Sequence, residues 1–179
     1  MKRPTASEII ELYKMVPLEP EGGFFKETYK DKSTYNDLPA PFTGRRPYST
    51  AIYYLLPKGA VSLLHRIASD EVWHFYLGGP MTIVQISPDG NLQSVVLGQN
   101  LLQGEVVQHV VPAGHWFGGF PNCETDFAFV GCTVAPGFDY TDFEMANRDE
   151  LLRRYPQHKE MVETLTQTSV AKHSQGPGF

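Results

Sequence analysis

The sequence predicts an all-β protein, a sandwich or a barrel, with short helices near its two ends. A series of short apolar runs between about 48 and 134 indicates strands, and turns rich in glycine and proline separate them. The Asp89-Gly90 pair is typical of a hairpin turn, because glycine accepts the positive φ that such a turn requires. Little helical periodicity interrupts these runs, which is why a closed or stacked sheet is favoured.

A helix is expected at the start of the chain. Thr5 and Glu8 have the spacing of a capping box. Apolar residues then recur at helical spacing until Pro17, so the predicted helix covers about 6–16.

Two further short helices are expected after the strands. Asn147 and Glu150 have the spacing of a helix cap, and Pro156 opens a second helix, so the helical region covers about 147–166. The polar tail 168–179 is predicted to be loose.

The strands follow one another at regular spacing. The predicted strands are 24–29, 48–56, 61–67, 71–77, 81–86, 92–96, 105–111, 116–120 and 127–134. Between the first two lies a long polar loop at 30–47. Its Arg45-Arg46 pair is a candidate to cover a pocket mouth, with a solvated loop or a subunit contact as the alternatives.

Composition narrows the class of protein. A chain of 179 residues fits one domain, with a core at about 20–145, and 41% apolar residues exclude a disordered or fibrous chain. A net charge of −5 argues against nucleic acid as a partner. No apolar run is long enough to be a signal peptide or to span a membrane. Cys123 and Cys132 are predicted to be reduced thiols, and a cytoplasmic location is expected.

The stretch from Gly59 to Gly78 predicts a pocket. It contains His65, then Glu71 six residues later, then His74. The apolar runs around them place His65 and Glu71 on neighbouring strands, and the glycines supply the turns. Two polar groups that face one interior from neighbouring strands make a pocket.

This spacing resembles the first motif of the cupin superfamily, in which a second histidine follows two residues after the first. Ile67 occupies that second position here. The run Pro112-Ala113-Gly114 resembles the middle of the second cupin motif, with Phe117 at its histidine position. The resemblance implies a cupin double-stranded β-helix, or jelly roll.

Metal-binding cupins hold a divalent metal with three histidines and one glutamate. Only His65 and Glu71 of that set are present here, and affinity depends on ligand number. We therefore expect no metal and no other cofactor. A divalent metal held with the help of His74 or His115 is the disfavoured alternative.

A closer resemblance covers about 5–166. The segments 21–29, 49–54, 65–76 and 132–144 are similar to the cupin-5, or DUF985, family. Members of this family are jelly-roll proteins of unknown function, commonly dimers, related in shape to nucleotide-sugar epimerases. The resemblance therefore implies a homodimer.

His65, Glu71 and His74 are the candidate catalytic residues. Histidine changes charge near neutral pH, which makes a histidine in a pocket a natural acid or base, whereas a purely structural histidine is the alternative. A buried carboxylate must be paired. We expect Glu71 to orient His65, to accept a ligand hydroxyl, or to pair with Lys26 or Arg66.

Strand alternation orders the neighbouring side chains. From Glu71, it points Trp73 and Phe75 the same way and sends His74 to the opposite face, unless a bulge intervenes. Most of the aromatic residues belong in the core. Trp116 is the choice to stack on a ligand, and Tyr53 offers a donor and an acceptor. The full set of candidate ligand-binding residues is Lys26, Tyr53, Arg66, Trp73, Phe75, Trp116 and Phe129.

The leading hypothesis is a pocket for a small polar ligand, such as a nucleotide, a nucleotide sugar or a sugar phosphate, with metal-independent sugar isomerase or epimerase activity. His65 would remove a proton next to a carbonyl, Glu71 or His74 would hold its tautomer, and Tyr53 would return a proton. Two alternatives are a sensor or carrier without turnover, and a metal-dependent cupin oxygenase or isomerase.

Overall fold

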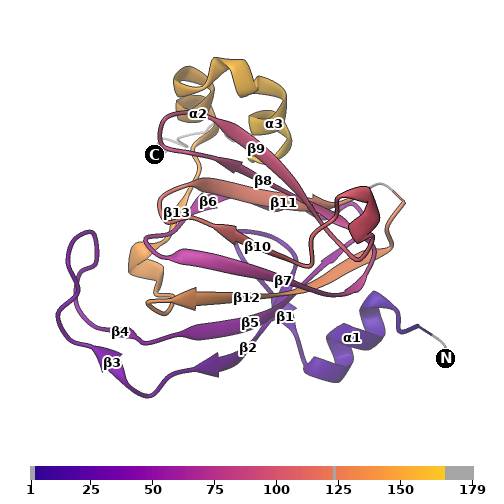
Figure 1. Cartoon of the computed structure of the whole chain (residues 1–179), viewed down its shortest axis with the longest axis horizontal. Coiled ribbons are helices and arrows are strands. Elements are labelled where there is room, and N and C mark those ends of the chain that lie inside the picture. The colour runs from indigo at the N-terminus through magenta and orange to yellow at the C-terminus, as the bar shows by residue number, and fades with distance from the viewer. Residues whose placement is uncertain (1–2, 123, 168–179) are drawn as a thin grey trace, which may run out of the picture.

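The computed structural model describes residues 3–122 and 124–167. Two antiparallel sheets face each other, and a separate two-stranded hairpin extends from one end of the larger sheet (Figure 1). The larger sheet has the order β1 (Val16–Pro17), β2 (Phe24–Lys30), β5 (Thr50–Pro57), β12 (Phe127–Ala135), β7 (Asp70–Gly78) and β10 (Gln108–Val111). The smaller sheet has the order β13 (Glu144–Met145), β6 (Ser62–Arg66), β11 (Trp116–Pro121), β8 (Met81–Ile86) and β9 (Leu92–Leu97). The hairpin pairs β3 (Thr34–Tyr35) with β4 (Arg46–Pro47).

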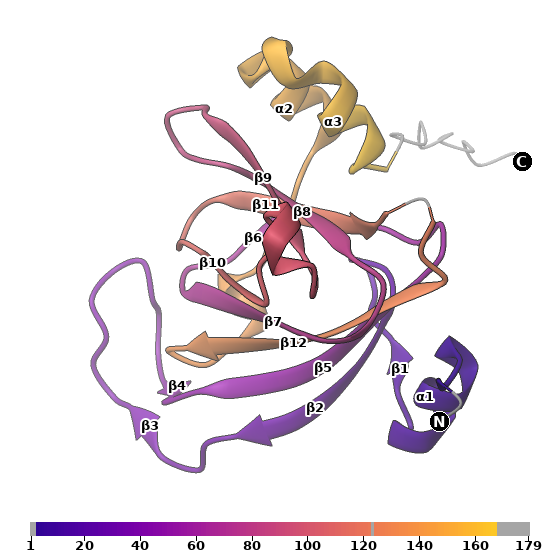
Figure 2. The same ribbon diagram turned by 45° about the vertical axis from the view of Figure 1, so that its right-hand side comes forward.

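The chain crosses repeatedly from one sheet to the other. β5 and β7 belong to the larger sheet, β6 and β8 to the smaller, and β10 to β13 alternate in the same way. Figure 2 shows the two sheets converging at one side and opening at the other. This arrangement confirms the predicted jelly roll, and it leaves an interior lined by the inward side chains of both sheets.

Short helices cover the outer faces. α1 (Ala6–Tyr13) packs on the larger sheet, where Ile9 contacts a cluster with Leu55 and Phe129. α2 (Arg148–Arg154) and α3 (Lys159–Thr164) pack on the smaller sheet (Figure 1). The 3₁₀ turns are η1 (Leu101–Gln103), η2 (Tyr140–Asp142) and η3 (Pro156–His158). No helix in the described part of the chain is both long and apolar enough to cross a bilayer.

The predicted helix caps are present, but the first helix is shorter than expected. The Thr5 hydroxyl accepts from the Glu8 N–H at 3.2 Å, and the Thr5 N–H donates to the Glu8 carboxylate at 2.7 Å. The helix then ends at Tyr13, because Lys14 adopts a left-handed conformation with φ 51°. Val16–Pro17 forms the edge strand β1, where proline's missing N–H is tolerated.

Two strand boundaries differ from the prediction by two residues or more. β5 begins at Thr50 rather than at 48, and β10 begins at Gln108 rather than at 105. Glu105 instead accepts a hydrogen bond from the Asn100 N–H at 2.7 Å, which holds it in a turn. Cys123 and the tail 168–179, for which a thiol and a loose segment were predicted, lie outside the described residues.

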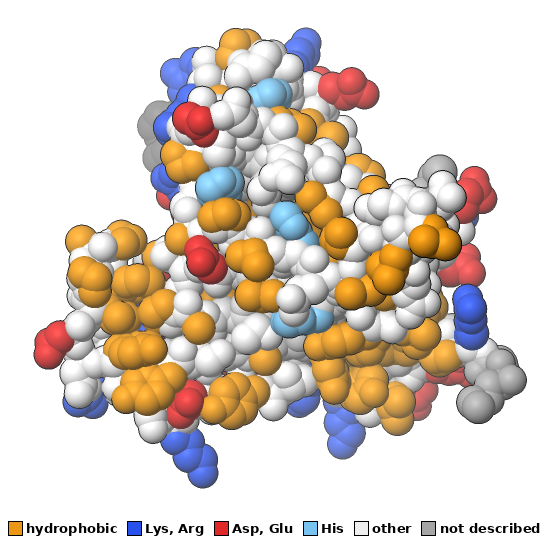
Figure 3. Space-filling model, in the orientation of Figure 1, with side chains coloured by type: hydrophobic (Ala, Val, Ile, Leu, Met, Phe, Trp, Pro, Cys, Tyr) orange, Lys and Arg blue, Asp and Glu red, His pale blue; other side chains and the backbone are white. Residues whose placement is uncertain are grey.

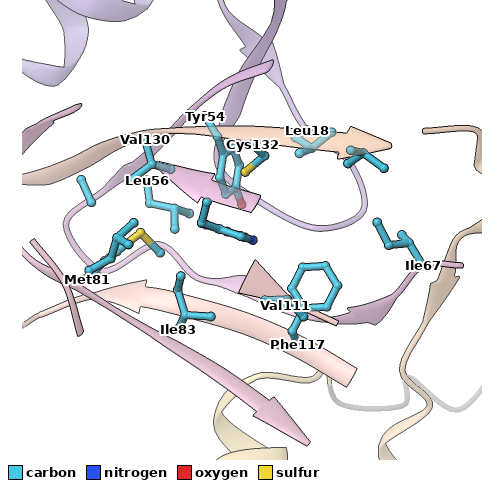
Figure 4. Close-up of a cluster of buried hydrophobic side chains, with 14 residues drawn as sticks. Leu18, Tyr54, Leu56, Ile67, Met81, Ile83, Val111, Phe117, Val130 and Cys132 are labelled. Carbon is cyan, nitrogen blue, oxygen red and sulfur yellow. The ribbon is translucent and has the colours of Figure 1, made fainter. Parts of the chain in front are cut away.

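The main core lies between the sheets. Its buried members include Tyr54, Trp73, Phe117 and Cys132 (Figure 4). Leu18 and Ile67 lie at the right-hand end of this cluster in Figure 4, and they border the cavity described next. The packed side chains thus fill one end of the barrel and leave the other end hollow.

Candidate functional site

A cavity of about 230 Å³ occupies the open end of the barrel. Its walls come from both sheets, from the turn between β1 and β2, and from the segment that follows β12. The residues that line it are Leu18, Glu21, Phe25, Glu27, Thr50, Ile52, His65, Ile67, Glu71, Cys132, Val134, Phe138 and Tyr140.

Strand register builds one wall of the cavity. Thr50, Val134 and Glu71 lie side by side on β5, β12 and β7, because Val134 pairs with Thr50 on one side and with Glu71 on the other. Ile52 and Cys132 form the next inward row. Alternation along each strand keeps these side chains on the same face of the sheet. The opposite sheet contributes His65 from β6, so the prediction that His65 and Glu71 lie on neighbouring strands is wrong: the chain crosses between the two sheets after β6, and the two side chains face each other from opposite sheets.

The His65 ring is fixed by its backbone surroundings. It is 3% exposed, and Nδ1 lies 2.7 Å from the carbonyl oxygen of Leu63. A carbonyl only accepts, so Nδ1 carries a proton and Nε2 is left to face other groups. Nε2 lies 3.5 Å from Oε2 of Glu21. The Leu63 carbonyl therefore takes the orienting role that was predicted for Glu71 or His74.

Glu21 is held at this position by hydrogen bonds of its own turn. Its carbonyl accepts from the Leu63 N–H at 2.8 Å, and the next carbonyl, that of Gly22, accepts from the Tyr54 hydroxyl at 2.8 Å. Gly22 has φ 106°, and a Cβ there would lie 2.3 Å from the Val61 carbonyl oxygen. Only glycine fits this turn, so the turn fixes where the Glu21 carboxylate points.

Glu71 is a buried carboxyl group and a weaker acid than an ordinary glutamic acid. Burial raises its pKa to about 7, and the nearby charge of Glu21 raises it as well, whereas His65 and a hydrogen bond from Cys132 act in the opposite direction. Burial and the charge of Glu71 raise the pKa of the Cys132 thiol well above its ordinary value. Near neutral pH, Glu71 is therefore a mixture of acid and carboxylate, while Cys132 stays a thiol.

The cavity does not fit a divalent metal. Ile67, where metal-binding cupins have a histidine, presents an alkyl side chain to the cavity, and the Phe117 ring lies 4.2 Å from the His65 ring, centroid to centroid. Within residues 3–122 and 124–167, no group of three His, Cys, Asp or Glu side chains could hold a metal ion. Neither His74 nor His115 lines the cavity.

Of the three candidate catalytic residues, the structure brings His65 and Glu71 together and places His74 elsewhere. His74 projects from the other face of β7, as strand alternation predicts. Its Nε2 lies 3.1 Å from the Thr133 hydroxyl, and its ring stacks with Tyr76.

None of the candidate ligand-binding residues lines the cavity. Trp73 and Phe75 point inward but belong to the core behind it. Tyr53 and Phe129 pack under α1 on the outer face of the larger sheet. Trp116 packs near α2 and α3.

The candidate cations also lie outside the cavity. Lys26 is exposed on β2. Arg66 pairs with Glu144 at 2.6 Å and covers the Trp116 ring at 4.4 Å. Arg45 is exposed, whereas Arg46 is buried and paired with Asp142 at 2.6 Å.

Glu21 and Cys132 are cavity residues that were not predicted from the sequence. Glu21 lies in a turn, and strand alternation does not predict the direction of a side chain there. The sequence signal for Glu21 is its position directly before Gly22-Gly23. These glycines indicate a turn, and the apolar strand at 24–29 that follows holds this turn close to the sheet.

Comparison with known proteins gives the same architecture. A family model described as "Cupin superfamily (DUF985)" matches residues 7–146. The uncharacterized protein YML079W of Saccharomyces cerevisiae is 37% identical over an alignment of 145 residues, with a coverage of 73% of this chain and 71% of the yeast protein.

Two solved structures are similar over most of the chain. Protein SO0799 from Shewanella oneidensis has a TM-score of 0.82 at 37% identity, covering 92% of this chain and 99% of that one. A hypothetical protein from Leishmania major has a TM-score of 0.83 at 30% identity, covering 92% and 100%. The resemblance expected from the motifs is confirmed, and function has to be argued from the cavity.

Proposed function

The chain belongs to the DUF985 family of the cupin superfamily, and from that premise we propose that its barrel binds a small hydroxy-carbonyl compound of monosaccharide size and moves protons on it. The observation that carries this proposal is the pairing of His65 and Glu71 in one cavity, with the pKa of Glu71 raised to about 7. An acid and a base in a partly apolar cavity can catalyse isomerisation or epimerisation by proton transfer at the carbon next to a carbonyl.

Each group has a role that its geometry supports. Nε2 of His65 accepts the proton from the carbon next to the carbonyl, since Nδ1 is occupied by Leu63. Glu71 in its acid form donates to the carbonyl oxygen, which becomes an enol hydroxyl, and the reverse transfers complete the exchange. Glu21 is a positioning residue that stabilises the imidazolium formed at His65. No metal is required for these transfers.

The cavity favours a smaller ligand than the expected nucleotide sugar. Its 230 Å³ lie below the range of about 300–1,000 Å³ that is typical of pockets for drug-sized ligands. A diphosphate favours guanidinium partners, yet no Lys or Arg is among the described residues that line the cavity. A sugar or sugar fragment without a phosphate suits this lining better.

The test is hydrogen exchange on candidate sugars. Small aldoses and ketoses are incubated with the protein in D₂O with a chelator, and NMR follows deuterium at the carbon next to the carbonyl. We expect exchange with the wild type, and a loss of at least about 100-fold in His65→Gln and in Glu71→Gln, since general acid–base groups contribute factors of this size. His74→Gln is the matched control, because His74 lies outside the cavity.

A sensor or carrier is the second candidate, favoured by the partly apolar lining. It predicts that sugars bind to the wild type and to His65→Gln without any exchange in either. If neither a sugar of this series nor an amino sugar exchanges deuterium, the proton-transfer proposal is wrong.

A further inference from the structure

The cavity has a strong excess of negative groups. Glu21, Glu27 and Glu71 all line it, and the only basic side chain among the described lining residues is His65. Glu21 and Glu71 are 9% and 8% exposed, so solvent screens them little. Carboxylates in such a place need a positive partner.

Two of the nearby cations, both arginines, are paired with other groups. Arg46 directs its donors to Asp142, to the Thr141 hydroxyl and to the carbonyls of Thr43 and Arg45. Arg66 is engaged by Glu144 and by the Trp116 ring.

Among the described residues, Glu71 has no strong hydrogen-bond donor. Its hydrogen bond comes from the thiol of Cys132, which is a weak donor. Among the same residues, only the charge of His65 favours its ionisation beside that weak bond. The pKa of Glu71 is raised because burial and the negative charge of Glu21 both oppose its ionisation. A cation beside Glu21 would offset the charge of that carboxylate and reduce its repulsion of Glu71.

Aromatic rings complete the surroundings. Phe25, Phe138 and Tyr140 line the cavity, and the Phe138 and Tyr140 rings meet edge to face at 5.0 Å. Tyr140 is 60% exposed, and the pair between Arg46 and Asp142 holds its segment against β4. Figure 3 shows hydrophobic side chains gathered at the left of the molecule, where Figure 1 places the β3–β4 hairpin. Ring faces attract ammonium groups, and a combination of rings and carboxylates is how proteins recognise amines.

We propose that the ligand of this cavity carries a protonated amine, which lies between Glu21 and Glu27 against the aromatic wall, while Glu71 in its acid form faces the carbonyl. The inference rests on the proposed function and narrows its substrate class to amino sugars or amino alcohols of similar size. The protein recognises the ligand by its amine, while His65 takes the proton from the carbon next to the carbonyl and Glu71 donates to the carbonyl oxygen.

The experiment uses matched probes that differ in charge alone. Cyclohexylammonium, cyclohexanol and cyclohexyl phosphate are titrated into the full chain by calorimetry at pH 7.5, in low salt and in 0.5 M NaCl. We expect cyclohexylammonium to bind at least tenfold more tightly than cyclohexanol and to weaken in high salt. Cyclohexyl phosphate should be the weakest of the three.

Two variants locate the amine. Glu21→Gln and Glu27→Gln should each weaken cyclohexylammonium by about tenfold and leave cyclohexanol unchanged. Glu27 lies on an exposed part of β2, so its substitution keeps the test informative if Glu21→Gln fails to fold. Glu144→Gln is the matched control, because its carboxylate pairs with Arg66 and does not line the cavity.

Each outcome decides between the proposals. Equal affinity for the ammonium and the alcohol, tighter binding of the phosphate, or no binding of any probe overturns the amine inference. If glucose or fructose exchanges deuterium while the ammonium shows no preference, the inference fails and the proposed function stands. If the ammonium binds through Glu21 and Glu27 while no sugar or amino sugar exchanges, the inference stands and the proton-transfer function fails.

Discussion

Arg46 and Asp142 form a two-pronged ion pair beside the cavity. Nε to Oδ2 and Nη2 to Oδ1 both measure 2.6 Å, and the two side chains are 3% and 7% exposed. The pair ties β4 to η2, the segment that carries Tyr140 to the cavity. Arg46 is thus a structural clamp at the end of the long loop, and it has no donor to spare for a ligand.

Asp142→Asn should destabilise the protein substantially. It leaves the Arg46 guanidinium buried without its counter-charge, and breaking such a pair costs about 3–5 kcal/mol. The free energy of unfolding in urea measures the loss. Glu144→Gln is the control, since its pair with Arg66 is 36% and 53% exposed and should contribute less than about 1 kcal/mol. Equal losses in the two variants would contradict the clamp.

The stability of the protein should fall as pH rises through the titration of Glu71. Its folded pKa is raised from 4.5 to about 7, so the folded state binds more protons than the unfolded state between these values. Below about 4.5 both states are protonated and there is no penalty; the penalty grows up to about pH 7 and is constant above it. Its size is at most about 3 kcal/mol.

The measurement compares wild type with Glu71→Gln by urea unfolding from pH 4 to 8. The variant has no ionisable group at this position, so the difference in unfolding free energy isolates the carboxyl. Wild type should lose stability relative to the variant between pH 4.5 and 7. A constant difference over that interval would show that Glu71 ionises normally.

The sequence predicts the parts of this site that obey strand alternation. The apolar pattern indicates that His65 and Glu71 each lie on the inward face of their strand. Because these strands belong to opposite sheets, the two side chains face one cavity. The same rule sends His74 outward. It also explains the position of Trp73, which points inward and packs in the core rather than lining the cavity.

The remaining site residues depend on contacts that no local pattern encodes. The apolar run that contains Tyr53 and Tyr54 is buried on both faces, one under α1 and one in the core, so the sequence does not reveal which tyrosine points inward. Trp116 is covered by helices from the far end of the chain. Glu21 reaches His65 through a turn held by Leu63 and Tyr54.

Gly22→Ala should disrupt the site more than an ordinary glycine substitution. Its φ of 106° is strained for alanine, and the new Cβ would lie 2.3 Å from the Val61 carbonyl oxygen. We expect a loss of more than about 2 kcal/mol, above the left-handed penalty of roughly 1–2 kcal/mol. Gly59→Ala is the matched control, with φ 78° and no atom within 4 Å. If the two variants unfold at the same denaturant concentration, Val61 does not restrict this turn.

Restoring the two missing histidines should create a metal site. Ile67 lines the cavity with His65 and Glu71, and Phe117 pairs with His65 across β11 and β6. The double variant Ile67→His/Phe117→His would therefore present three imidazoles and one carboxylate to one space, which is a ligand set suited to a transition metal. Wild type lacks half of that set, so it should retain little metal after dialysis.

Elemental analysis after dialysis against zinc or nickel measures the gain, and we expect close to one ion per chain in the double variant. Bound metal should also raise its melting temperature, because the ion binds the folded form. The effect should strengthen above about pH 7, where Glu71 is ionised and able to ligate. Adding Glu71→Gln to the double variant should weaken retention. A folded double variant that holds no more metal than wild type would mean that the four positions do not converge on one point.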